Sequence, residues 1–191
     1  MVLAANLVAV LGFPTLARAA TIFGVNVPPD TLTPFARGTG LPASLAVDSS
    51  GDLLSGNLSG GVSVLPASTG TLFGVSVTAN DPATVTNNGP GGFGIGASAL
   101  AFDSAGNLYI ADNAGTISVL AKTATTLFGV SITANTLTTL VSSGLVSPDG
   151  LAFDSAGNLY IAEAGVGNVL VLPKTTTTVF GVSVTANTLT T

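Results

Sequence analysis

Three polar residues occupy one equivalent position in an internal repeat of the sequence. Asn57, Asp112 and Glu163 each lie just beyond a short apolar stretch that is predicted to be the second strand of a repeat unit. Carboxylate and amide oxygens bind hard cations and also accept hydrogen bonds from polar ligands. If the units are arranged around a common axis, these side chains converge on one rim and form a candidate ligand site. The alternative is that each side chain caps its own turn.

A second recurring pattern is Asp-Ser-Ala-Gly-Asn, which occurs at 103–107 and 154–158 and has a diverged copy at 48–52. Calcium takes about six to eight oxygen ligands, usually from several carboxylates, and each of the two intact loops supplies only one carboxylate. The pattern instead predicts a hairpin turn. In this turn Asp103 caps the chain and Gly106 takes the positive φ that such a hairpin needs.

The composition excludes several kinds of chemistry. The chain has no histidine and no cysteine, which removes the commonest general base, the commonest transition-metal ligand, thiolate nucleophiles and disulfides. Four basic residues stand against nine acidic ones, so the chain cannot neutralise a run of phosphates. We therefore expect no catalytic residues, no cofactor, no resident metal and no nucleic-acid partner.

The repeat that positions these residues is about fifty residues long. The segment LAFDSAGNLYIA occurs at 100–111 and again at 151–162, and a diverged copy begins at Leu45. A second block, Phe-Gly-Val, a variable residue and then Val or Ile, recurs at Phe23, Phe73, Phe128 and Phe180. Two independent blocks with one period indicate three repeat units. Tyr109 and Tyr160 are equivalent, and we expect them to pack between units rather than to stack on a ligand.

Each unit is predicted to contain four strands. In the middle unit the strands are expected at 98–103, 108–111, 116–120 and 136–141. The inner strands are apolar on both faces, as in a sheet packed between two others, whereas the alternating threonines of the last strand suit an outer strand. Helix-favouring residues are scarce and β-branched residues are plentiful. The fold class is therefore all-β, and four-stranded sheets at this period indicate β-propeller blades.

The repeat also resembles a known family. The pattern GLAFDSAGNLYIA at 150–162, followed by an acidic residue and then by Val-Leu-Val-Leu at 169–172, resembles the NHL repeat. The resemblance covers 45–191 and implies a radial propeller with binding surfaces at its loop faces and no fixed activity. The Phe-Gly-Val-Ser insert resembles a variant in secreted bacterial NHL proteins, which implies an extended hairpin between the third and fourth strands.

Two classes of function follow from these patterns. The first is a non-catalytic module for binding, adhesion or structure, whose surface is rich in uncharged Thr, Ser, Asn and Gly. The alternative is a fragment of a propeller enzyme that resembles gluconolactonases or virginiamycin B lyase. The lyase family uses histidine and a metal, and this chain has no histidine. The lactonase family binds a divalent cation through acids and asparagines. That reading requires either that Asn57, Asp112 and Glu163 converge or that missing blades supply the site.

The N-terminal segment predicts export. Residues 1–19 are predicted to be a signal peptide, because an apolar run ends in the small-x-small pattern Ala17-Arg18-Ala19. The run is too short to span a membrane, so we expect a secreted protein of the cell envelope or exterior, in a bacterial-type setting. Residues 20–40 match only the last part of a unit and are predicted to be an orphan outer strand. The three NHL-like blades are expected at 41–86, 97–142 and 148–191.

Three blades do not close a ring, so an open arc leaves two apolar sheet faces bare. The stabilising free energy lost by leaving these apolar side chains exposed is about 12–24 kcal/mol per face. This exceeds the net stability of a typical domain, about 5–15 kcal/mol. We therefore expect the ring to be incomplete. Either further chain follows Thr191, which is the preferred reading, or partners cover the faces, with self-association of the open blades as one form.

Overall fold

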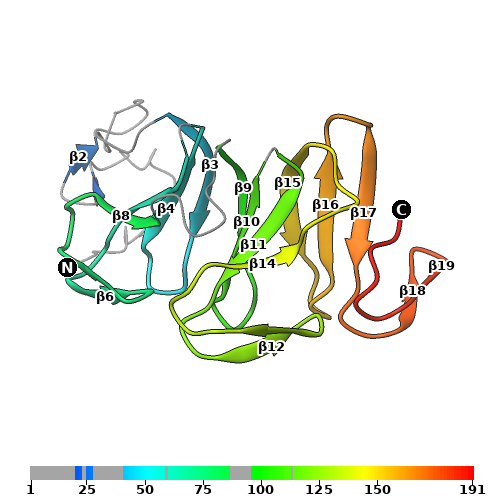
Figure 1. Ribbon diagram of the computed structural model, residues 1–191. Coiled ribbons are helices and arrows are strands. Elements are labelled where there is room, and N and C mark those ends of the chain that lie inside the picture. Colours follow the sequence, from blue (N-terminus) through cyan, green and yellow to red (C-terminus); the bar gives the residue numbers. More distant parts are fainter. Residues whose placement is uncertain (1–19, 23–24, 28–40, 59, 87–95, 113) are drawn as a thin grey trace, which may run out of the picture.

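The computed structural model describes residues 20–22, 25–27, 41–58, 60–86, 96–112 and 114–191, and every regular element in these ranges is a β-strand (Figure 1). The expected all-β fold is confirmed. The predicted signal peptide, 1–19, lies outside the described residues, as does most of the predicted orphan strand, 20–40. The described part of that segment forms the hairpin of β1 (Ala20–Ile22) and β2 (Val25–Val27).

Three antiparallel sheets follow one another along the chain and stand side by side in a row (Figure 1). The first sheet pairs its strands in the order β3 (Pro42–Val47), β4 (Leu53–Asn57), β5 (Val62–Leu65) and β8 (Ala83–Thr86). The second sheet has the order β9 (Ala97–Phe102), β10 (Leu108–Asp112), β11 (Thr116–Leu120) and β14 (Thr138–Val141). The third sheet has the order β15 (Pro148–Phe153), β16 (Leu159–Glu163) and β17 (Asn168–Leu172).

The fourth strand differs from the prediction in the second and third units. In the second sheet it begins at Thr138 rather than at 136, because Asn135 has a positive φ of 55° and the Thr136 amide hydrogen-bonds Thr133 in a turn. In the third sheet a fourth strand is replaced by a single bridge between Val171 and Thr190. Thr190 is the equivalent of Thr138, the first residue of β14.

A two-stranded hairpin interrupts each unit between its third and fourth strands. These hairpins lie along one edge of the row, at the bottom of Figure 1. They are formed by β6 (Gly70–Leu72) with β7 (Val75–Val77), β12 (Thr125–Leu127) with β13 (Val130–Ile132), and β18 (Thr177–Val179) with β19 (Val182–Val184). The Phe-Gly-Val insert is therefore a hairpin that folds back on itself.

The turn of each hairpin places a phenylalanine in the left-handed region of φ. Phe73, Phe128 and Phe180 have φ of 48°, 46° and 47°, and the glycine after each is also positive. Two positive φ values define the type I′ turn, whose twist matches the two strands that it joins. A bulky residue in this region costs on the order of 1–3 kcal/mol, so surrounding contacts have to hold it there.

The core lies between the sheets. We use the term leading face for the face of a sheet that is turned toward the preceding sheet, and trailing face for the opposite one. Leu54, Val62 and Val64 on the trailing face of the first sheet pack against Leu108 and Ile110 on the leading face of the second. All five side chains are fully buried. This contact follows from the alternation of apolar side chains on both faces of inner strands.

The second and third sheets repeat the same contact. Tyr109, Ile117 and Val119 on the trailing face of the second sheet pack with Leu159 and Ile161 on the leading face of the third. The first strands of neighbouring sheets also lie against each other.

Serine hydroxyls join these first strands. Ser44 Oγ donates to the Ala97 carbonyl at 3.4 Å, and Ser98 Oγ donates to the Pro148 carbonyl at 2.6 Å. Apolar packing and a serine hydrogen bond therefore recur at both junctions.

Candidate functional site

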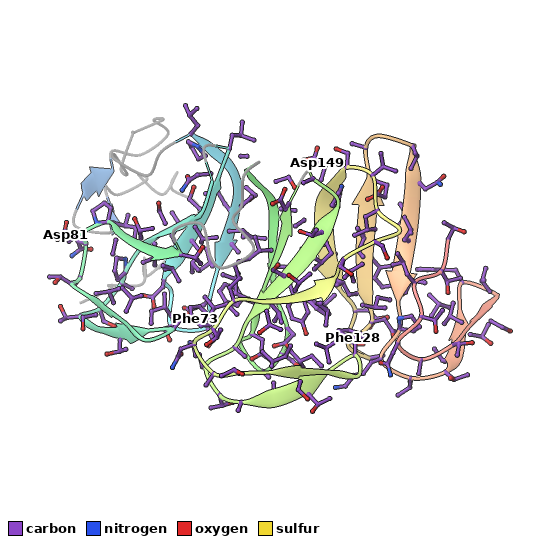
Figure 2. The ribbon with its side chains drawn as sticks, in the orientation of Figure 1. Phe73, Asp81, Phe128 and Asp149 are labelled. Atoms are coloured by element: carbon purple, nitrogen blue, oxygen red, sulfur yellow. The ribbon has the colours of Figure 1, made fainter. Side chains whose placement is uncertain are left out.

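The three rim residues, Asn57, Asp112 and Glu163, are the last residues of β4, β10 and β16. The prediction that they lie just beyond the second strand is therefore wrong by one position, because each still pairs with a residue of the first strand. The pairing partners are Pro42, Ala97 and Pro148. Figure 2 labels Asp149, next to Pro148, at the edge of the row opposite Phe73 and Phe128. The rim residues thus share the edge that lies away from the hairpins.

All three rim side chains are buried and hydrogen-bonded, although among the described residues Glu163 Oε1 has no hydrogen-bond partner. Asn57 Nδ2 donates to Ser63 Oγ at 3.0 Å. The Ala114 amide donates to Asp112 Oδ1 at 2.7 Å, which is the geometry of a turn cap. The Val146 and Ser147 amides donate to Glu163 Oε2 at 2.7 and 3.3 Å, so Glu163 holds the loop that leads into the third sheet.

The hydrogen bonds of the rim join each side chain to a neighbouring strand, turn or loop. Burial raises the pKa of Asp112 above its ordinary value, and the hydrogen bond from the Ala114 amide only partly opposes this. Within the described ranges no three His, Cys, Asp or Glu side chains are grouped so that they could hold a metal ion. No hydrogen bond of the described residues joins one rim side chain to another.

The recurring Asp turns have the predicted geometry. Asp154 Oδ1 accepts from the Ala156 and Asn158 amides at 3.0 and 2.9 Å, and Asp154 Oδ2 accepts from Asn158 Nδ2 and the Tyr160 hydroxyl at 2.8 and 3.1 Å. Burial alone would raise the pKa of Asp154, but these hydrogen bonds outweigh it and hold the pKa below its ordinary value. Four donors saturate the carboxylate and leave no lone pair for a cation.

In the first unit, an ion pair replaces the hydrogen bond that Asn donates to the turn aspartate in the later units. Asp52 stands where the later units have Asn, and a carboxylate cannot donate to Asp48. Lys122 of the second unit supplies the donor instead, with its Nζ 3.4 Å from Asp48 Oδ2 and 5.6 Å from the centre of the Phe73 ring. The ammonium thus ties the first unit to the second.

The two equivalent tyrosines lie in different surroundings. Tyr109 is buried, and its ring meets Phe153 of the third sheet edge-on, with centroids 4.7 Å apart. Burial, together with the charge of Asp103 and a hydrogen bond to it, raises the pKa of Tyr109. Tyr160 is half-buried and faces Phe180 of its own unit, with centroids 6.1 Å apart. Packing between units thus holds for Tyr109, whereas Tyr160 has no following sheet in the described chain.

A groove of about 190 Å³ lies on the trailing face of the third sheet. Tyr160, Val169, Phe180, Val182 and Thr190 are among its lining residues. Phe180 is 93% exposed, whereas its equivalent Phe73 is 4% exposed. The sequence predicted bare outer faces but did not identify the residues that line this groove. The signal was available, because the Phe-Gly blocks at Phe73 and Phe128 are followed by another unit in the sequence, whereas the block at Phe180 is not.

Comparisons with known proteins do not assign a family. No protein-family model matches the sequence, and no curated protein matches it significantly. Among solved structures, the computationally designed Ika4 protein aligns with 72% of this chain and 93% of its own length. The identity is 19% and the TM-score is 0.38, which is too low to inform fold or function. In the described ranges no helix is long and apolar enough to cross a membrane.

Proposed function

We propose that this chain is an exported, non-catalytic module for binding and assembly, built from NHL-like β-propeller blades and acting at the cell envelope or exterior. The radial arrangement is supported by the side-by-side first strands, because successive sheets of a propeller meet at their innermost strands. The two recurring serine hydrogen bonds, from Ser44 and Ser98, support the same arrangement, since they join equivalent strands at equivalent positions.

The observation that carries the binding role is the exposed apolar groove of the third sheet. Phe180 is 93% exposed, Val169 is 64% exposed and Val182 is 49% exposed, and all three line one groove. Contiguous exposed apolar surface marks an interaction site in a soluble protein. A binding role therefore explains a surface that would otherwise lower solubility.

The acidic residues support binding over chemistry. Asp154 is saturated by four hydrogen-bond donors, Glu163 anchors the loop at 146–147, and Asp112 caps its own turn. A general base needs a lone pair that can reach a substrate proton. Asp112 and Asp154 use theirs to shape turns. Glu163 uses Oε2 to hold a loop, and its Oε1 is buried away from solvent without a hydrogen-bond partner among the described residues.

Expression of the chain with its own N-terminus in a bacterial host tests this function. We expect the mature protein to begin at Ala20 by mass spectrometry and to be retained in the envelope fraction. The variant Phe180→Asn should shift the protein into the medium, because it removes the apolar contact. The matched control Val146→Asn changes a residue that is 59% exposed and lies outside the groove, so it should leave retention unchanged.

Two results would contradict the proposal. A cytoplasmic protein that keeps Met1 would exclude export. Wild-type protein that is found free in the medium to the same extent as the Phe180→Asn variant would exclude a binding role for the groove.

A further inference from the structure

We infer that the trailing face of the third sheet binds the leading face of the first sheet of a second copy of this chain, head to tail. This inference rests on the proposed binding role and names its partner. Its basis is internal. The chain contains two junctions of this kind, and among the described residues the first and the third sheet each present an uncovered half of such a junction.

The trailing face of the third sheet repeats the residue pattern that the second sheet uses. Tyr160 corresponds to Tyr109, Val169 to Ile117, and both Tyr109 and Ile117 are buried by the third sheet. Val169 is 64% exposed, against 0% for Ile117. The third sheet therefore keeps an apolar face suited to a following sheet.

The leading face of the first sheet is the complementary half. Leu45 is 63% exposed, whereas its equivalent Leu100 is 7% exposed and packs against the first sheet. Val47 is 61% exposed, whereas its equivalent Phe102 packs at the same junction. Both residues alternate along β3 and point to one face.

At the hairpin edge, each junction also pairs the turn glycine of one unit with an asparagine of the next unit. At the first junction a Cβ placed on Gly74 would lie 3.3 Å from Asn135 Cβ, and at the second a Cβ placed on Gly129 would lie 3.6 Å from Asn187 Nδ2. Nothing lies within 4 Å of a Cβ placed on Gly181. The missing asparagine has an equivalent in Asn80 of the first unit, which is exposed and has the same left-handed φ, 61°.

Backbone strain at Phe180 supports the same occupant. Phe73 and Phe180 adopt the same left-handed conformation, but only Phe73 is buried against a following unit. Strained conformations persist where surrounding contacts over-determine them. The contact that would cover Phe180 is the one that the second unit makes with Phe73.

A second copy fits better than an unlike partner because one chain presents both halves. Such a contact joins different patches on the two copies, so it either closes into a ring or continues as a filament. Either assembly satisfies the inference, because both use the same junction.

A mixing experiment with purified 191-residue chains tests the junction. Phe180→Asn removes the apolar contact of the trailing face, and Asn tolerates the left-handed φ at this position. Leu45→Glu places a charge on the leading face. Light scattering should show that wild type forms oligomers and that each variant alone is a monomer. An equimolar mixture of the two variants should form a dimer, because each retains the half that the other lacks.

The controls separate this junction from misfolding and from other contacts. Leu58→Glu changes a leucine that is 53% exposed and lies beside Gly96 of the second unit, and Val146→Asn changes a valine that is 59% exposed before the third sheet. Both variants should assemble like wild type. Circular dichroism should show wild-type strand content for every variant. A monomeric wild type, a mixture without dimer, or a Leu45→Glu variant that dimerises alone would overturn the inference. If the mixture dimerises but the wild-type protein is not retained in the envelope fraction, only the proposed role at the envelope is rejected and the junction stands.

Discussion

The strand-end position on the rim holds an amide in the first sheet and carboxylates in the other two, although all three side chains are buried. Asn57 satisfies its site without charge, through Ser63. Asp112 keeps a carboxylate in a site whose burial raises its pKa. The first sheet thus indicates which change the second sheet would tolerate.

Replacing Asp112 with Asn should stabilise the protein at pH 7, with an increase in Tm of about 1–3 °C. The amide oxygen still accepts from the Ala114 amide, and no charge has to be buried. A carboxyl whose folded pKa is raised binds its proton more tightly in the folded state, so wild-type stability falls as pH rises from 3.8 through the folded pKa. The gain from Asp112→Asn should therefore vanish below about pH 4 in thermal unfolding.

Asp154→Asn is the opposite case and serves as its control. The folded pKa of Asp154 is lowered, so its contribution is present above pH 3.8 and is lost as pH falls through the folded pKa. The variant should be less stable than wild type at pH 7 and approach it in acid. Two variants with the same pH profile would contradict the environments described for these carboxylates.

Calcium should not stabilise the protein. Each oxygen of Asp154 already accepts two hydrogen bonds, so a cation would have to displace donors that the turn needs. We expect the same Tm in millimolar calcium and in EDTA by differential scanning calorimetry. A calcium-dependent increase of several degrees would show that a turn or the rim opens to bind the ion.

At the scale of elements, the sequence predicts the turns of some hairpins but not of others. The Asp-Ser-Ala-Gly-Asn turns were predictable, because Gly106 and Gly157 take the positive φ and Asp caps locally. The turn at Phe128 was not predictable from its residue, since a bulky side chain seldom adopts a positive φ. The Phe128 ring packs edge-on against Tyr109, with centroids 6.3 Å apart, and the sequence of a single hairpin does not reveal this contact.

For the rim, too, the sequence predicted the repeated positions but not the tertiary contacts that their side chains make. The repeat predicted that Asn57, Asp112 and Glu163 are equivalent. It did not predict that Glu163 reaches across to the amides of Val146 and Ser147, because loops between sheets differ in sequence from unit to unit.

Replacing Gly56 with Ala should destabilise the junction between the first two sheets by about 1–3 kcal/mol. A Cβ at Gly56 would clash with Ser44 Oγ and would lie 2.8 Å from the Ala97 carbonyl oxygen, which belongs to a backbone that cannot move freely. Urea unfolding measures the loss. The control Gly70→Ala should have a smaller effect, since nothing lies within 4 Å of the added Cβ.

At the scale of the whole molecule, the main contacts between the described sheets join the first to the second and the second to the third, so stability depends on how many faces are covered. The second sheet is covered on both faces, and Tyr109, Ile110, Ile117 and Val119 are all within 1% of full burial. The third sheet is covered only on its leading face, which leaves Val169 exposed.

Amide hydrogen exchange should follow this order. We expect the slowest exchange in β10 and β11 and faster exchange in β17, because local opening costs least where one face is bare. At concentrations where the wild-type chain assembles, protection should increase in β17 to β19 and in β3. Uniform protection of all three sheets in a monomer would show that they unfold as one unit.

The near-identity of 100–111 and 151–162 also has a consequence for the gene. Recombination between the two corresponding gene segments would remove or add one period of 51 residues in frame. Because the leading face of the third sheet matches that of the second, a shortened product still joins compatible faces at Leu54 and Leu159. Alleles with different numbers of units are therefore expected to encode folded chains, and the assembly tolerates variation in length that would destroy a protein with unlike junctions.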